Sequence, residues 1–307
     1  MTATTDLDLG PLSWVKGEID LALGRAHDAL GKFVDNSGDS AQLKFARTHL
    51  HQAHGALSIV GLDGVTQLSE TIEQLLSDAE CGQVAATAAV GELAQRAIAA
   101  IRLYLDEVAS GMPGQPLKFL EIYRDLLAAR GVERAAPSDL FFPDLTLRPP
   151  KRTEEPSSLP AGEVATRLKT ERARFERGFL RWLRNAEDVS GVVEMREAVA
   201  AIEATQALPA ARAFWWITIA LLDALAAQQV SGDFQVKKLC ARIDLQMRRL
   251  LEGSKTVSER LVRDALYFVA VAKGGGGLVQ QVKDVYRLDA LVPTPVADIE
   301  PLKPVLR

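Results

Sequence analysis

Apolar residues in the first 110 positions recur in alternating steps of three and four. This spacing predicts four amphipathic helices, separated by breaks at residues 36–38, 61–64 and 80–85. Four such helices joined by short loops are typical of an antiparallel bundle, and a fifth helix over residues 116–130 is expected to pack outside it. The predicted apolar stripes are Val15, Ile19, Ala22, Ala26, Leu30 and Phe33, with Trp14 at the start; Leu43, Ala46, Leu50, Ala53, Leu57 and Val60; Val65, Leu68, Ile72, Leu75 and Ala79; and Val90, Leu93, Ala97, Ile101, Tyr104 and Val108.

Proline and charge interrupt the helical pattern over residues 132–160. This composition predicts a linker between two lobes. Residues 140–145 are too apolar to stay in water, so we expect them to dock onto one of the bundles. Helical periodicity resumes over residues 161–292, and residues 293–307 are predicted to be a disordered tail or a linker. The sequence therefore predicts an all-α protein with an N-terminal lobe over residues 1–131 and a second helical bundle over 161–292.

Composition narrows the classes of function. The net charge is −4, and no basic patch with interleaved aromatic residues is present, so nucleic-acid binding is not expected. Residues 214–227 form the most apolar window, but they are too few to span a bilayer and include Asp223, so we expect a buried helix and no membrane insertion. The N-terminus lacks the pattern of a signal peptide. Cys81 and Cys240 are far apart in the chain and are expected to be core residues of a cytoplasmic protein.

Three of the four histidines lie close together at positions 49, 51 and 54. Leu50 and Ala53 belong to the apolar stripe of this predicted helix, so His51 and His54 are expected to project into solvent on the other side. His49 falls on the flank of the stripe. Gly55 follows, although a glycine inside a helix costs about 1 kcal/mol relative to alanine. An exposed histidine beside a glycine that admits another molecule is what a phosphoryl-accepting site requires.

The spacing His51-x-x-x-Gly55, followed by Gly61, resembles the motif of histidine phosphotransfer (HPt) domains. The resemblance implies a four-helix bundle in which His51 accepts the phosphoryl group and a glutamate of the next helix, here Glu73, hydrogen-bonds the imidazole. The sequence departs from the motif at one position. His54 occupies the place of the lysine that helps to neutralise the phosphoryl group.

Further segments are similar to the N-terminal region of ChpA/PilL-type chemosensory kinases of type IV pilus systems and to FimL-type scaffold proteins. They are residues 50–57, 140–145, 214–216 and 288–292. The resemblance implies as partners a CheY-like response regulator, a chemotaxis-type histidine kinase and a polar landmark protein that recruits the chain to the cell pole. It also implies a role in twitching motility and cyclic AMP signalling.

Two functions follow from the sequence. The first is a degenerate HPt scaffold that is not an enzyme and binds a response regulator. The alternative is an active phosphotransfer domain with His51 as acceptor, since the second lobe contains no histidine. A metal site on His51 and His54, completed by His27 or Glu73, is a third possibility. The Glu-x-x-His pairs of di-metal bundles are missing, so we expect no metal and no cofactor.

Overall fold

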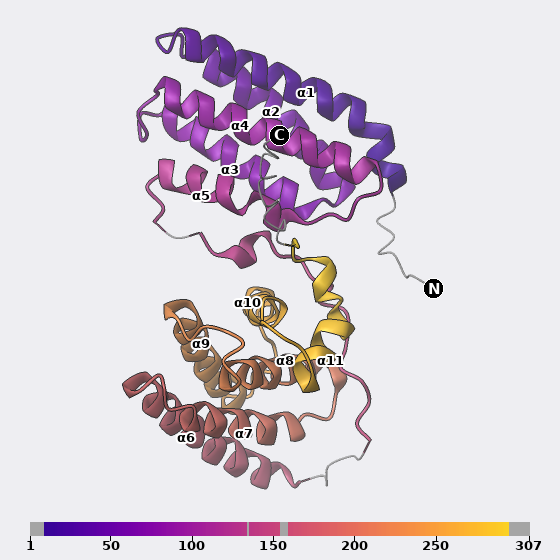
Figure 1. The fold of residues 1–307 in the computed structure, drawn as a ribbon, viewed down its shortest axis with the longest axis vertical. Coiled ribbons are helices and arrows are strands. Elements are labelled where there is room, and N and C mark those ends of the chain that lie inside the picture. The colour runs from indigo at the N-terminus through magenta and orange to yellow at the C-terminus, as the bar shows by residue number, and fades with distance from the viewer. Residues whose placement is uncertain (1–8, 134, 154–158, 295–307) are drawn as a thin grey trace, which may run out of the picture.

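The computed structural model describes residues 9–133, 135–153 and 159–294, and these residues form eleven α-helices and no strand (Figure 1). The predicted all-α fold class is thereby confirmed. The helices are α1 (Leu9–Asp35), α2 (Ala41–Val60), α3 (Asp63–Glu80), α4 (Ala88–Ala109), α5 (Leu120–Ala129), α6 (Ala161–Arg184), α7 (Ser190–Ala204), α8 (Pro209–Ala226), α9 (Phe234–Leu251), α10 (Glu259–Ala270) and α11 (Gly277–Tyr286). Short 3-10 helices occur at η1 (Pro116–Phe119), η2 (Pro137–Leu140) and η3 (Leu288–Ala290).

The N-terminal lobe is built from α1 to α4 as an antiparallel bundle, with α5 packed across α3 and α4 (Figure 1). The predicted stripes face its core, and in α2 all of them except Val60 are buried. Helix α2 ends where Gly61 adopts φ 78° and its N–H reaches the carbonyls of Leu57 and Ser58, a left-handed cap that glycine adopts without strain. One prediction is wrong: Trp14 is 84% exposed, and Leu12 packs in the core instead. The reason is that Trp14 lies on the outer side of the turn that carries Leu12.

The second lobe surrounds α8, whose residues are buried almost throughout. This helix is the one in the described chain that is long and apolar enough to cross a membrane, and 72% of its apolar window is buried inside the protein. It packs against α7, α10 and α11. The rings of Trp215 and Trp216 are both buried, so α8 is the core helix that the sequence predicted.

The segment between the lobes packs on both of them. The side chain of Leu140 is buried in the apolar core of the N-terminal lobe, whereas the next residue, Phe141, is buried in the core of the second lobe. The expectation that residues 140–145 dock onto a single bundle is therefore wrong. Leu140 ends the 3-10 helix η2 and Phe141 continues in an extended conformation, so their side chains enter different lobes and one short stretch contributes to two cores. Of the predicted tail, residues 295–307 lie outside the described part of the chain.

The two cysteines have different environments. Cys240 is fully buried in α9, and this burial raises the pKa of its thiol to about 12. Cys81 is exposed at the C-terminal end of α3, so the prediction that both cysteines are core residues is wrong for Cys81. It follows the last buried position of α3, Ala79, and the helix ends before it can turn inward.

Candidate functional site

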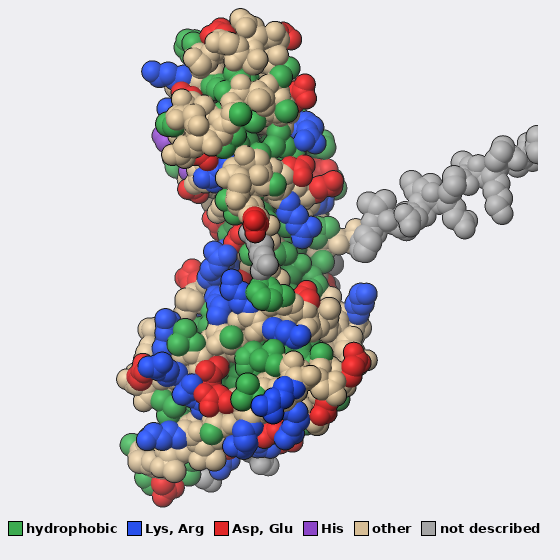
Figure 2. Space-filling model, turned by 90° about the vertical axis from the view of Figure 1, so that its left-hand side faces the viewer, with side chains coloured by type: hydrophobic (Ala, Val, Ile, Leu, Met, Phe, Trp, Pro, Cys, Tyr) green, Lys and Arg blue, Asp and Glu red, His purple; other side chains and the backbone are tan. Residues whose placement is uncertain are grey.

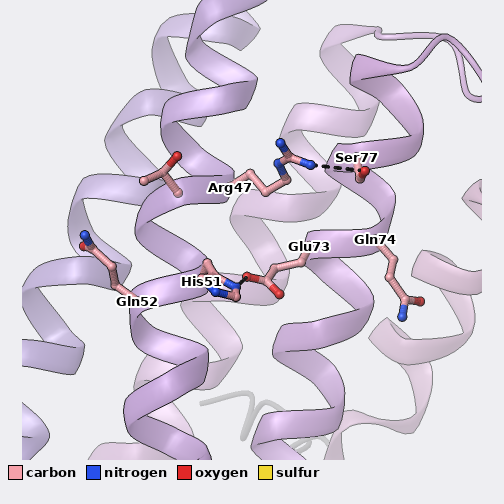
Figure 3. A pocket seen from close by; sticks show the side chains of 7 residues that line it. Arg47, His51, Gln52, Glu73, Gln74 and Ser77 are labelled. Carbon is pink, nitrogen blue, oxygen red and sulfur yellow. Dashed lines mark hydrogen bonds and ion pairs between the residues drawn. The ribbon is translucent and has the colours of Figure 1, made fainter.

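Helices α2 and α3 lie side by side and hold the candidate site between them (Figure 3). Leu50 and Ala53 face the bundle core, and this phase turns the side chain of His51 outward, where it is 77% exposed. Its Nδ1 lies 3.0 Å from Oε1 of Glu73, a largely buried side chain of α3. This is the hydrogen bond that the HPt resemblance implies between these two residues.

The contact with Glu73 determines which nitrogen of His51 is free. A carboxylate can only accept a hydrogen bond, so Nδ1 of His51 must carry the proton that it donates to Glu73. In the neutral imidazole the other nitrogen, Nε2, then has the lone pair. The side chain is exposed, and Nε2 is therefore available to a group approaching from solvent.

Arg47 adds a positive charge to the same surface. It precedes His51 by one helical turn, and its Nη1 lies 3.2 Å from Oγ of Ser77 while its Nε lies 2.8 Å from Oε2 of Glu80. With His51 and Glu73, it lines a surface depression of about 560 Å³ (Figure 3). The sequence analysis did not single out Arg47. Its i, i−4 spacing from His51 was the signal that pointed to this shared face.

His54 does not project freely into solvent, so that part of the prediction is wrong. Its side chain is half-buried, and its Nδ1 is buried with no hydrogen-bond partner. The pairs Arg47–Ser77 and His51–Glu73 fix an antiparallel register in which His54 lies level with residues 69 and 70 of α3. Because this nitrogen is buried, it cannot contact a group that approaches His51 from solvent. His54 is thus a weak replacement for an exposed lysine.

The rings of His51 and His54 stack nearly parallel, with their centroids 6.4 Å apart and an angle of 11° between the planes. His49 lies apart from this pair on the flank of the stripe, as predicted, with Nδ1 3.3 Å from Oε1 of Gln52. Within residues 9–133, 135–153 and 159–294 no group of three His, Cys, Asp or Glu side chains is arranged to hold a metal ion. Of the three clustered histidines, His51 has the exposed ring, whereas those of His49 and His54 are partly buried.

His51, Gly55 and Ile59 form an exposed ridge along α2, because each follows the previous one by four residues. The side chain of Ile59 is 83% exposed, which is unusual for a large apolar residue beside a polar site. The sequence analysis missed Ile59, although its position outside the apolar stripe was visible. The ridge combines the imidazole ring of His51, a gap at Gly55 and the exposed apolar side chain of Ile59.

Gly55 is expected to be replaceable as far as this chain's own packing is concerned. A Cβ atom added there would have no atom within 4 Å, so Gly55→Ala should raise the free energy of unfolding by about 0.5–1 kcal/mol through helix propensity. Urea denaturation measures the change. Gly91→Ala is the control. It should lower the free energy of unfolding, because a Cβ atom on residue 91 would lie 2.8 Å from the side chain of Val34. A loss of stability in Gly55→Ala would contradict the open geometry around this residue.

Comparisons with known proteins match most of the chain. A family model described as the FimL scaffold protein second domain matches residues 160–298, and one described as the FimL C-terminal domain matches residues 12–127. The scaffold protein FimL of Pseudomonas aeruginosa is 26% identical over 295 residues, which are 94% of this chain and 51% of that protein. The chain thus spans about half the length of this curated relative. A comparison with solved structures finds no match.

Proposed function

Because the chain belongs to the FimL family, we propose that it is a non-enzymatic scaffold that docks a CheY-like response regulator on the outer face of α2, in the control of type IV pili and twitching motility. The relative is named a scaffold protein, which supports the general role. The exposed ridge of His51, Gly55 and Ile59 is the observation that carries the docking site.

The ridge is suited to a protein partner. Gly55 leaves space for a partner backbone to approach α2, and Ile59 offers an apolar side chain that a partner can bury. Arg47 lies beside the ridge, next to His51, and its positive charge complements an acidic partner surface. A chemotaxis-type kinase and a polar landmark protein that brings the scaffold from the cytoplasm to the cell pole complete the proposed set of partners.

The details around His51 favour a scaffold over a phosphoryl carrier. The position of the HPt lysine is occupied by His54, whose Nδ1 is buried without a partner. Arg47 is already engaged by Glu80 and Ser77, which reduces its freedom to follow an incoming phosphoryl group. The surface can therefore bind a regulator while lacking a free cation at the place where the phosphoryl charge would develop.

The carrier remains the second candidate because of one contact. With Nδ1 bonded to Glu73, the lone pair of Nε2 of His51 can attack the phosphorus of an aspartyl phosphate on the regulator. A new N–P bond forms, the bond between phosphorus and the aspartate oxygen breaks, and the aspartate leaves as a carboxylate. Glu73 then stabilises the positively charged ring.

Ile59→Glu is expected to weaken binding of the cognate regulator at least about tenfold, since it places a charge where the partner buries an apolar side chain. Its native side chain is exposed, so stability should not change. Surface plasmon resonance with each CheY-like regulator of the host measures affinity. Leu103→Glu, at an exposed apolar position of α4, is the matched control. Wild-type affinity in Ile59→Glu, or no regulator binding to the native chain, would refute the docking site.

The His51→Gln variant distinguishes the scaffold hypothesis from the phosphoryl-carrier hypothesis. If the protein is a scaffold, the His51→Gln variant binds the regulator with an affinity within about threefold of wild type and restores motility in a complementation test. The reason is that glutamine still donates a hydrogen bond to Glu73. A carrier acquires an acid-labile phosphate from the phosphorylated regulator, and His51→Gln abolishes that label and the motility together. An established HPt domain labelled in parallel shows that the conditions support transfer.

A further inference from the structure

A second cavity lies between the two lobes and is lined by basic side chains. Its volume is about 690 Å³, and it is bounded by α5 of the N-terminal lobe, the segment 135–138, and α9 and α10 of the second lobe. Figure 2 shows Lys and Arg side chains gathered at the narrow region where the lobes meet. The cations are Arg124 of α5, Lys238 and Arg242 of α9, and Arg260 of α10. None of these residues lines the depression around His51.

Carboxylates neutralise only part of this charge. Arg242 is paired with Asp264, which is buried and also accepts a hydrogen bond from Ser138. Arg260 lies 3.0 Å from a carboxylate oxygen of Asp139. Among the residues that the structure describes, no carboxylate pairs with Arg124 or Lys238. Two cations from opposite lobes therefore face the cavity unpaired, in a protein whose net charge is −4.

The acidic residue Asp233 also lines the cavity, but its carboxylate is in use. It caps the N-terminus of α9 and accepts hydrogen bonds from the backbone N–H groups of Gln235 and Val236. The cap satisfies two of the free amides at the start of the helix. With Asp139, the partner of Arg260, three carboxylates stand beside the four cations, so the cavity keeps an excess of one positive charge.

The remaining wall is apolar and aromatic. Leu239 is buried, and the rings of Tyr267 and Phe268 meet edge to face with their centroids 5.3 Å apart. Burial raises the pKa of Tyr267, so its hydroxyl stays protonated at neutral pH and can donate a hydrogen bond. No acceptor for this hydroxyl is present in the described part of the chain. A wall of this kind suits a ligand with an organic portion beside its charge.

We propose that this cavity binds a small phosphate-bearing anion of about mononucleotide size. Its volume falls in the range of small-molecule sites, roughly 300–1,000 Å³. Arg124 and Lys238 neutralise the phosphate from the two sides, and the aromatic wall receives the remainder of the ligand. Because these two cations belong to different lobes, the bound anion links the N-terminal lobe to the second lobe.

The test is isothermal titration calorimetry of the full chain with adenosine 5′-monophosphate and with inorganic pyrophosphate as probes. We expect binding of at least one probe that weakens as salt is raised. Arg124→Gln and Lys238→Gln should each reduce affinity about tenfold, and the double variant about a hundredfold. Neither native side chain has a carboxylate partner to lose, so both variants should fold. Arg102→Gln, an exposed arginine of α4 outside the cavity, is the matched control.

Three results would overturn the proposal. The first is the absence of binding by both probes at low salt, and the second is wild-type affinity in the double variant. The third is equal affinity for adenosine and its monophosphate, because the phosphate would then contribute nothing. A poly-glutamate peptide is titrated alongside, and binding of the peptide without either probe would assign the basic cavity to an acidic protein partner instead.

Discussion

Gly178→Ala is expected to lower the free energy of unfolding of the second lobe by about 3 kcal/mol. Helices α6 and α7 cross where Gly178 faces Gly191, and a Cβ atom on Gly178 would lie 2.5 Å from the carbonyl oxygen of Gly191. It would also come within 3.1 Å of the backbone nitrogen of Met195. Backbone atoms cannot move aside as a flexible side chain does, so the two helices must separate and lose packing along their length.

Urea denaturation followed by tryptophan fluorescence measures this loss. Trp182, Trp215 and Trp216 are buried in the second lobe, whereas Trp14 is exposed, so the signal reports mainly on that lobe. Gly162→Ala is the matched control in the same helix, because its added Cβ would meet nothing within 4 Å. Gly162 lies in the first turn of α6, so the control should change the free energy of unfolding by less than about 0.5 kcal/mol. Equal midpoints for Gly178→Ala and Gly162→Ala would show that the close crossing does not exist in solution.

Glu203→Ala is expected to cost about 3–5 kcal/mol because it removes the carboxylate that pairs with two largely buried guanidinium groups. Oε1 of Glu203 lies 2.6 Å from Nε of Arg212 and 3.2 Å from Nη2 of Arg152, and all three side chains are largely buried. The same arginines reach across to backbone carbonyls, Arg212 to that of Pro150 and Arg152 to that of Gln206. The cluster fastens the connecting segment to α7 and α8, so its loss should also loosen residues 148–153.

The control for this prediction is Glu252→Ala, which removes an ion pair with Arg248 in which both side chains are about 60% exposed. A pair screened by solvent contributes little, so a change within about 0.5 kcal/mol is expected. Thermal and urea unfolding compare the two variants, and hydrogen exchange locates the loosened region. The buried cluster would have no special role if Glu203→Ala were as stable as Glu252→Ala.

The helical pattern alone was enough to predict the architecture of the N-terminal lobe. The stripe Leu43, Ala46, Leu50, Ala53 and Leu57 is the buried side of α2, and the end at Gly61 is the left-handed cap. These features depend on contacts within a few residues, which the local sequence encodes directly. The same phase argument gave the exposure of His51, because a residue next to Leu50 in sequence lies about 100° away on the helix.

The sequence predicted only some of the contacts between helices. The pairing of His51 with Glu73 was expected because the chain resembles a family in which those positions meet, and periodicity does not give it. The role of Arg47 had no such support, since Ser77 and Glu80 lie about 30 residues further along the chain. A pair of this kind depends on the register of α2 against α3. Register is set by the packing of both helices together.

The sequence by itself determined the all-α class, the positions of the helices and the outward direction of His51. Only the tertiary structure decided that His54 is half-buried, that Leu140 and Phe141 enter different cores, and that a basic cavity forms where the lobes meet. The physical reason is that periodicity gives a side chain's direction relative to its own helix axis. Burial and charge pairing depend on which distant segment packs against that side, and only the tertiary structure shows this.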